Sequence, residues 1–473
     1  MRQLRIFGVL GVVLYVLAQF VMFQLSLARV PDTWTIGGAA YPEEPIEIAV
    51  EHVRADLTPP LTLHYLDQTF QLDPASIDFS VDVTETLRLV REARSQSAAL
   101  GDFLRQLIFQ PPAARDVPVV VSYSDEQVRA QLAAAAAQHD RVPRPPQPVT
   151  ATLSLQAAQP GHLLNIVQSM PAVDAALKSV THRDVVLIVD ELAAPPPTLD
   201  LLAQLFEARL ASFRGRAGVF MKDLRTGEEI NLNAGAAFSG AGLLKLPAVM
   251  EAYRRSVDAP DEATAQLIAA ALQTEQSNQP ANALLAALGN GDAAAGAGDV
   301  TALARALGLR DTFMALPYDQ PITATQAVSI STPANSKAAF DTGADRALQT
   351  TPADMGLLLE MIAQCRDSGG ALLAVMPAQF SSQKCEALAA ALRDDAPTDV
   401  PPLLGGVPAG TREVIHRPGG TATMRADAAL VYSPGGDYVL VVCLSALDQP
   451  LDWDAANAVM ADLSRAAYDY FNP

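Results

Sequence analysis

The N-terminal segment carries a long apolar run. After Arg2 and Arg5, hydrophobic side chains extend from Ile6 to Leu27 and are interrupted by Gln19 and Gln24. A run of this length can cross a bilayer as one helix. Positive charge on its N-terminal side keeps that end in the cytoplasm. The pattern therefore predicts a single-pass anchor in the cell membrane over residues 1–30, with the bulk of the protein extracytoplasmic.

A cleaved signal peptide is the alternative for this segment. Ser26-Leu-Ala28 has the small-x-small pattern of a cleavage site. The apolar run is longer than the core of a usual signal peptide, which favours an uncleaved anchor. A stalk that contains Pro and Gly follows over residues 31–44.

Residues 45–194 alternate between strand and helix patterns. Residues 60–74 alternate apolar and polar side chains about a turn, as a hairpin does, and residues 82–95 place apolar side chains on one helical face. Residues 116–138 combine a strand with a helix, and residues 184–192 form a further strand pattern. We expect a small α+β domain here.

A proline-rich linker at residues 195–198 precedes a second pattern over residues 199–473. This pattern has strands at both ends and helices between them. The strands are expected at 217–235, 413–420 and 427–447, and the main helices at 198–213, 261–309, 352–364 and 454–471. Such an order predicts one antiparallel sheet whose terminal segments meet, flanked by helices, within a multidomain α+β protein.

Composition narrows the classes of partner. The chain has 473 residues and a net charge of -19, so nucleic acid would be repelled, and we expect no nucleic-acid partner. The six histidines are scattered and no Cys/His cluster has metal-ligand spacing, so we expect neither a metal nor a cofactor. We expect Cys365 and Cys385, which share one irregular region, to form a disulfide, and Cys443 in an apolar strand to be a buried free thiol.

Three short stretches carry the candidate chemistry: FSGAGLLKLP at 238–247, EQSNQPANALL at 275–285 and VIHRPGG at 414–420. Together with the layout of residues 199–473, they resemble the class A β-lactamases and penicillin-binding serine hydrolases. The resemblance implies three motifs. Ser-x-x-Lys supplies a nucleophile and its activating amine, Ser-Asp-Asn a shuttling hydroxyl, and Lys-Thr-Gly a grip on the substrate carboxylate.

The first motif retains its lysine and lacks its serine. Lys245 matches the motif lysine, and the nucleophile position three residues earlier is Gly242. Glycine has no side chain to acylate. The nearest hydroxyl, Ser239, precedes the lysine by six positions.

The other motifs also depart from the family pattern. Gln276 takes the shuttle position and Asn278 matches the motif asparagine; a register slip of one residue would instead make Ser277 the hydroxyl. Arg417-Pro418-Gly419 stands where Lys-Thr-Gly belongs, and its arginine can still grip a carboxylate. The family's deacylating glutamate has no counterpart.

Residues 45–194 resemble, in the order of their elements, the peptidoglycan-binding module that accompanies vancomycin-resistance W-type proteins. A plain spacer that holds the next domain off the membrane is the alternative, because fold analogy cannot supply a ligand.

These losses predict a pseudoenzyme of the cell envelope. Lys245, Asn278 and Arg417 would hold peptidoglycan or another D-Ala-terminated peptide without attacking it. One alternative is an active β-lactamase or D-Ala-D-Ala peptidase with Ser239 or Ser277 as nucleophile, and another is a structural spacer without a ligand.

Overall fold

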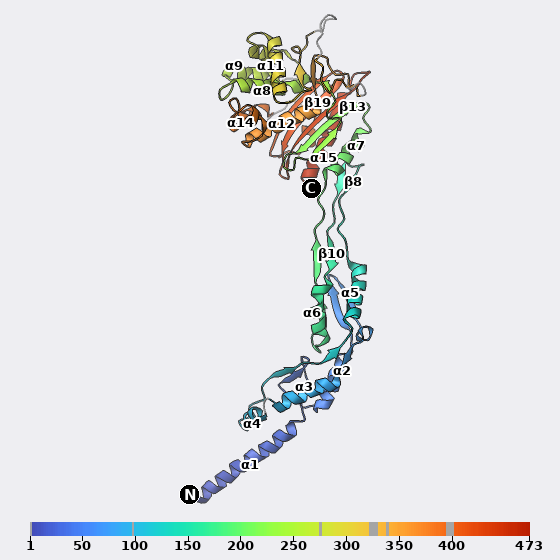
Figure 1. Cartoon of the computed structure of the whole chain (residues 1–473), viewed down its shortest axis with the longest axis vertical. Coiled ribbons are helices and arrows are strands. Elements are labelled where there is room, and N and C mark those ends of the chain that lie inside the picture. The colour runs from blue at the N-terminus through green and yellow to red at the C-terminus, as the bar shows by residue number, and fades with distance from the viewer. Residues whose placement is uncertain (1, 97–98, 274–276, 321–329, 337–339, 394–401) are drawn as a thin grey trace. The chain divides into compact units, whose positions relative to one another are not determined.

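The computed structural model describes residues 2–96, 99–273, 277–320, 330–336, 340–393 and 402–473 (Figure 1). The chain forms two compact units. The first comprises residues 1–145 and 158–195, and the second comprises residues 146–157 and 196–473.

The first unit combines six helices with short strands among its described residues. The helices are α1 (Arg2–Ser26), α2 (Ile46–Asp56), α3 (Val83–Gln96), α4 (Ala99–Leu107), α5 (Asp125–His139) and α6 (Ile166–Leu177). The strands are β1 (Trp34–Ile36), β2 (Ala39–Ala40), β3 (Leu61–Tyr65), β4 (Gln68–Leu72), β5 (Ser80–Val81), β6 (Arg115–Val117), β7 (Val121–Ser122), β10 (Gly161–Leu164), β11 (Asp184–Val186) and β12 (Val189–Leu192). The hairpin expected at 60–74 is β3–β4, paired in antiparallel register from Leu61↔Leu72 to Tyr65↔Gln68.

Two separate cores hold this unit together. One lies between the β11-β3-β4 sheet and helices α5 and α6, and includes Leu63, Leu132 and Val173. The other lies against α2 and α3, and includes Trp34, Val50 and Val90.

Within the part of the chain that the structure describes, no helix is both long enough and apolar enough to cross a bilayer.

The second unit is organised by one five-stranded antiparallel sheet in the order β14-β13-β20-β19-β18. Its strands are β13 (Arg216–Asp223), β14 (Glu229–Leu232), β18 (Glu413–Thr421), β19 (Met424–Tyr432) and β20 (Asp437–Ser445). The N-terminal strand β13 pairs with the C-terminal strand β20 from Arg216↔Ser445 to Asp223↔Tyr438. The expected sheet, closed by segments from both ends of the domain, is therefore confirmed. A separate hairpin, β8 (Gln147–Val149) with β9 (Ser154–Gln156), belongs to this unit.

Helices cover both faces of this sheet because its strands alternate two apolar sets. On β20, Leu440 and Val442 face α7 (Leu199–Leu210) and α15 (Trp453–Phe471), while Val439 and Val441 face the larger helical layer. That layer contains α8 (Lys245–Arg255), α9 (Glu262–Gln273), α10 (Gln279–Leu288), α11 (Ala293–Ala306), α12 (Pro352–Arg366), α13 (Gly370–Val375) and α14 (Ser382–Leu392). A small sheet of β15 (Phe238–Ser239), β17 (Leu348–Thr350) and β16 (Phe313–Met314) lies beside it.

Helix α12 is fixed at both ends. Thr351 caps its N-terminus by accepting a hydrogen bond from the Asp354 amide at 3.0 Å. A disulfide joins Cys365 of this helix to Cys385 of α14. Cys443 on β20 is a buried free thiol.

The Asp354 carboxyl is buried beneath this cap. Its Oδ2 accepts hydrogen bonds from Thr312 Oγ1 at 2.8 Å and from the Asp311 amide at 3.0 Å. Burial nevertheless raises the pKa of Asp354 to about 6, and the hydrogen bond from Thr312 only partly opposes this shift.

We predict that Asp354 makes stability depend on pH. Between about pH 4 and pH 6 the folded chain holds this proton and the unfolded chain has lost it, so the free energy of unfolding falls as pH rises. Asp354→Asn removes the titrating group and with it this fall in the free energy of unfolding. The stability of the variant relative to wild type should rise by about 2–3 kcal/mol from pH 4 to pH 7, as measured by chemical denaturation. Asp448→Asn, an exposed position of the same unit, is the control. An Asp354→Asn difference that is constant with pH would contradict the prediction.

Candidate functional site

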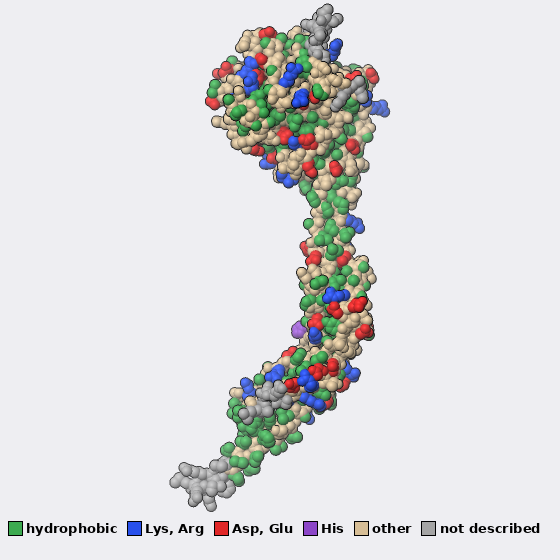
Figure 2. Space-filling view, in the orientation of Figure 1, with side chains coloured by type: hydrophobic (Ala, Val, Ile, Leu, Met, Phe, Trp, Pro, Cys, Tyr) green, Lys and Arg blue, Asp and Glu red, His purple; other side chains and the backbone are tan. Residues whose placement is uncertain are grey.

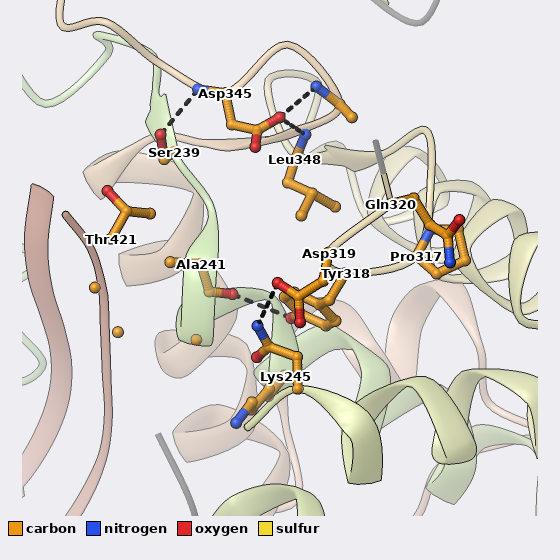
Figure 3. A pocket seen from close by; sticks show the side chains of 15 residues that line it. Ser239, Ala241, Lys245, Pro317, Tyr318, Asp319, Gln320, Asp345, Leu348 and Thr421 are labelled. Carbon is orange, nitrogen blue, oxygen red and sulfur yellow. Dashed lines mark hydrogen bonds between the residues drawn. The ribbon is translucent and has the colours of Figure 1, made fainter. Parts of the chain in front are cut away.

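A cavity of about 300 Å³ opens beside the small sheet of the second unit (Figure 3). Its lining comes from β15, β17, the 3₁₀ turn η2 (Ala241–Leu244), the start of α8, the end of β18 and three connecting segments, at residue 278, residues 317–320 and residues 345–347. The lining residues are Ser239, Ala241, Gly242, Lys245, Asn278, Pro317, Tyr318, Asp319, Gln320, Asp345, Ala347, Leu348, Gly419, Gly420 and Thr421. Segments far apart in the sequence therefore meet at one site.

Lys245 is the first residue of α8 and is only 3% exposed. Its neighbours in the helix, including Leu246 and Val249, are fully buried. A buried ammonium is costly unless it is paired or hydrogen-bonded, so this lysine is an unusual choice for a merely structural position. Its side chain lines the cavity.

Four of the six predicted site residues meet at the cavity: Gly242, Lys245, Asn278 and Gly419. Arg417 does not belong to the lining that the described residues form. This residue is 7% exposed, and its Nη1 donates a hydrogen bond at 2.8 Å to the carbonyl of Leu272 at the end of α9. Gln276 lies outside the described residues.

Gly242 and Gly419 allow two backbones to touch. A β-carbon at position 242 would collide with the Pro418 carbonyl oxygen and would lie 3.0 Å from Gly419 Cα. A β-carbon at Gly419 would lie 2.6 Å from the Gly242 nitrogen. Because these obstacles are backbone atoms, no rotamer change relieves them. A serine side chain at position 242 therefore has no room in this arrangement.

The two alternative hydroxyls differ in position. Ser239 lines the cavity, is 6% exposed and accepts a hydrogen bond at 2.8 Å from the Asp345 amide. Ser277 is exposed, and its Oγ accepts a hydrogen bond from the Gln279 amide at 3.3 Å. Ser239 is therefore part of the described cavity lining, whereas Ser277 is not.

Two asparagines of the 278–282 region hold the loop that borders the cavity. Asn278 Nδ2 donates to Asp319 Oδ1 at 3.2 Å. One turn later, the Asn282 amide exchanges two hydrogen bonds with the backbone of Tyr318, at 2.9 and 3.0 Å. The Tyr318 hydroxyl in turn donates to the Ala241 carbonyl at 3.1 Å, and burial raises the pKa of this phenol, which keeps it neutral (Figure 3).

Some lining residues were not identified by sequence reasoning: Tyr318, Asp319, Asp345 and Thr421. Asp345 Oδ1 accepts hydrogen bonds from the amides of Ala347 and Leu348, at 2.7 and 3.2 Å. The sequence feature that could have pointed to this loop is Asn282, one helical turn after Asn278, because its side-chain amide bonds to the backbone of Tyr318. The lining combines one ammonium with two carboxylates, so it can hold a polar ligand of mixed charge.

The sheet, its two helical layers and the lysine-bearing helix beside the edge strand define a β-lactamase-like α+β domain. The family model described as "Beta-lactamase enzyme family" matches residues 201–267 and 258–471, which is more than half of the chain. The chain therefore belongs to the beta-lactamase enzyme family.

Solved structures of low identity were also found. A β-lactamase from Desulfarculus baarsii is 20% identical, with 59% of this chain and 99% of that chain covered and a TM-score of 0.44. An ancestral class A β-lactamase is 22% identical over 56% of this chain and 98% of that chain, with a TM-score of 0.41. The protein PBP-A is 18% identical over 59% of this chain and 99% of that chain, with a TM-score of 0.43. No curated protein matches the sequence.

We predict that Gly242→Ser destabilises the second unit instead of restoring a nucleophile. The new side chain would collide with backbone atoms of β18, and overpacking of this kind costs about 1–3 kcal/mol. Chemical denaturation measures the loss. Gly235→Ser is the matched control, since no atom lies within 4 Å of the added β-carbon. Equal stabilities of the two variants would contradict the close approach.

Proposed function

We propose that the chain is a catalytically inactive member of its family that serves as a binding protein. The observation that carries this proposal is the contact of Gly242 with the backbone of Pro418 and Gly419. Acyl transfer by a serine enzyme needs a nucleophile within reach of its base. Here the nucleophile position has neither a hydroxyl nor space for one.

The strand that should grip a substrate carboxylate supports the same proposal. Arg417 has the required charge, yet its guanidinium bonds to the Leu272 carbonyl and does not join the described cavity lining. Pro418 removes a backbone donor from the strand segment nearest the site. Several separate elements of acyl transfer are therefore compromised together.

The finer proposal concerns ligand and location. We infer a single-pass, extracytoplasmic protein of the cell membrane that binds peptidoglycan or a related D-Ala-terminated peptide. Lys245 and Asn278, both in the cavity lining, are the groups that can meet a peptide carboxylate. Asp319 and Asp345 in the same lining favour a ligand that also carries an amine. The module at residues 45–194 would contribute wall binding or spacing.

Binding is testable by calorimetry with a D-Ala-D-Ala peptide. We expect measurable heat with the wild-type chain. Lys245→Met should weaken binding about tenfold or more, because a hydrogen bond to a charged group contributes about 1.5–3 kcal/mol. Arg225→Met, which removes a cation of the second unit whose side chain is 77% exposed and lies outside the cavity lining, is the control and should bind normally. Absence of heat at millimolar peptide would favour a structural spacer without a ligand.

An active serine hydrolase is the second candidate, and one observation favours it: Ser239 lines the same cavity as Lys245. Against it, the Ser239 hydroxyl is engaged by the Asp345 amide.

Mass spectrometry after incubation with a labelled penicillin separates the two functions. We expect the mass of the chain to remain unchanged, because no described nucleophile stands at the family position. A covalent adduct that disappears in Ser239→Ala would overturn the proposal of inactivity and identify the nucleophile.

A further inference from the structure

Helix α4 lies antiparallel along α1 in the first unit. The Phe103 ring, in the first half of α4, lies 5.7 Å from the Phe20 ring and 5.5 Å from the Phe23 ring. Just past the other end of α4, the Phe109 ring lies 6.2 Å from Tyr15. The two helices therefore run in opposite directions. Their ring contacts extend along α1 from Phe23 to Tyr15, which is about two turns or about 12 Å at 1.5 Å per residue.

The polar groups between the two helices satisfy one another. Gln19, which interrupts the apolar run of α1, accepts a hydrogen bond at 3.0 Å from Gln106 Nε2. The Tyr15 hydroxyl donates to the Leu107 carbonyl at 3.0 Å. In water these side-chain amides and this hydroxyl would be hydrogen-bonded by solvent, whereas in hydrocarbon each needs a partner within the protein.

The backbone carbonyls at the C-terminal end of α4 accept hydrogen bonds from the residues that follow. The amides of Ile108 and Gln110 donate to the Arg105 carbonyl at 3.1 and 2.9 Å, and the Phe109 amide donates to the Gln106 carbonyl at 3.1 Å. The Leu107 carbonyl accepts a hydrogen bond from Tyr15. The last carbonyls of a helix have no partner within the helix, but here those of residues 105–107 are all hydrogen-bonded. This arrangement suits an environment without water.

Large apolar side chains are nevertheless exposed at this end of α4. Leu104 is 53% exposed, Ile108 63% and Phe109 83%. Phe109 also has a φ of 56°, a left-handed conformation that is unfavourable for a bulky residue. Exposed apolar residues continue on α1, where Leu14 and Leu17 are 60% and 54% exposed, and hydrophobic side chains dominate the described surface there (Figure 2). Continuous apolar surface of this kind marks an interaction site.

Charges collect at the opposite end of the helix pair. Asp102 of α4 pairs with Arg94 at 3.7 Å, and both are nearly buried. Arg94 Nη2 also donates to the Ser26 carbonyl at the end of α1, at 3.1 Å. The pair is therefore charged at Ser26 and apolar toward Tyr15, a polarity that matches a path from headgroups into acyl chains. Arg105, exposed on α4, has a stem long enough to reach back to the headgroups.

We propose that α4 and the following Ile108 and Phe109 insert into the extracytoplasmic leaflet of the membrane beside α1. The occupant of this apolar face is the acyl-chain region of the lipid. The inference rests on the proposed function, whose membrane anchor is predicted from the apolar run Ile6–Leu27 of the sequence. Helix α4 can enter the bilayer only if that segment crosses it. Insertion would fix the orientation of the first unit at the membrane surface, which a single flexible tether cannot do.

Fluorescence quenching by lipids with brominated acyl chains tests the insertion. The full-length chain is reconstituted into vesicles after a single cysteine has been labelled with an environment-sensitive dye. Phe109→Cys is the test position, Leu17→Cys reports on the anchor, and Val186→Cys, 76% exposed elsewhere in the first unit, is the control. Background labelling should be low, since Cys443 is buried and the other two cysteines are paired.

We expect the dye to lose most of its fluorescence at positions 109 and 17 and none at position 186. Quenching at 17 without quenching at 109 would overturn the insertion of α4 and leave the anchor intact, including the case in which another protein covers Phe109. Absence of quenching at both positions would overturn the anchor itself, and the insertion with it.

Discussion

The close approach of η2 to β18 is the contact on which the candidate site depends. Gly242 and Gly419 lie far apart in the sequence, and each leaves room for the backbone of the other. A side chain at either position would separate the turn that starts the lysine-bearing helix from the edge strand of the sheet. The contact fills the space that a side chain at position 242 would need, and the cavity lies beside it among Lys245, Tyr318 and Asp345.

Around this contact, hydrogen bonds fix the loops that line the cavity. Asn278 and Asn282 hold the 318–319 segment, and the Tyr318 hydroxyl bonds back to the turn at Ala241. The Asp345 amide engages the Ser239 hydroxyl. A network of hydrogen bonds made within the protein gives the cavity a rigid lining.

Polar groups that are removed from water need hydrogen-bond partners, and this requirement applies in both units. Lys245 is buried in the cavity lining of one unit, and Gln19 of the apolar helix α1 bonds to Gln106 of α4 in the other. In both places a polar residue interrupts an apolar sequence. Such interruptions are costly and persist where the surrounding structure compensates them.

The sequence alone determined the alternating strands of the central sheet and the positions of Gly242, Lys245 and Asn278 relative to the family motifs. These features depend on local periodicity and short spacing. Tertiary structure decided where Arg417 points, since Arg417 and Gly419 share one face of β18 by the two-residue repeat and yet contact different elements. It also brought Tyr318, Asp319 and Asp345 to the cavity. The sequence of a loop has no periodic pattern from which its contacts can be predicted, and long-range packing alone determines which loop residues meet.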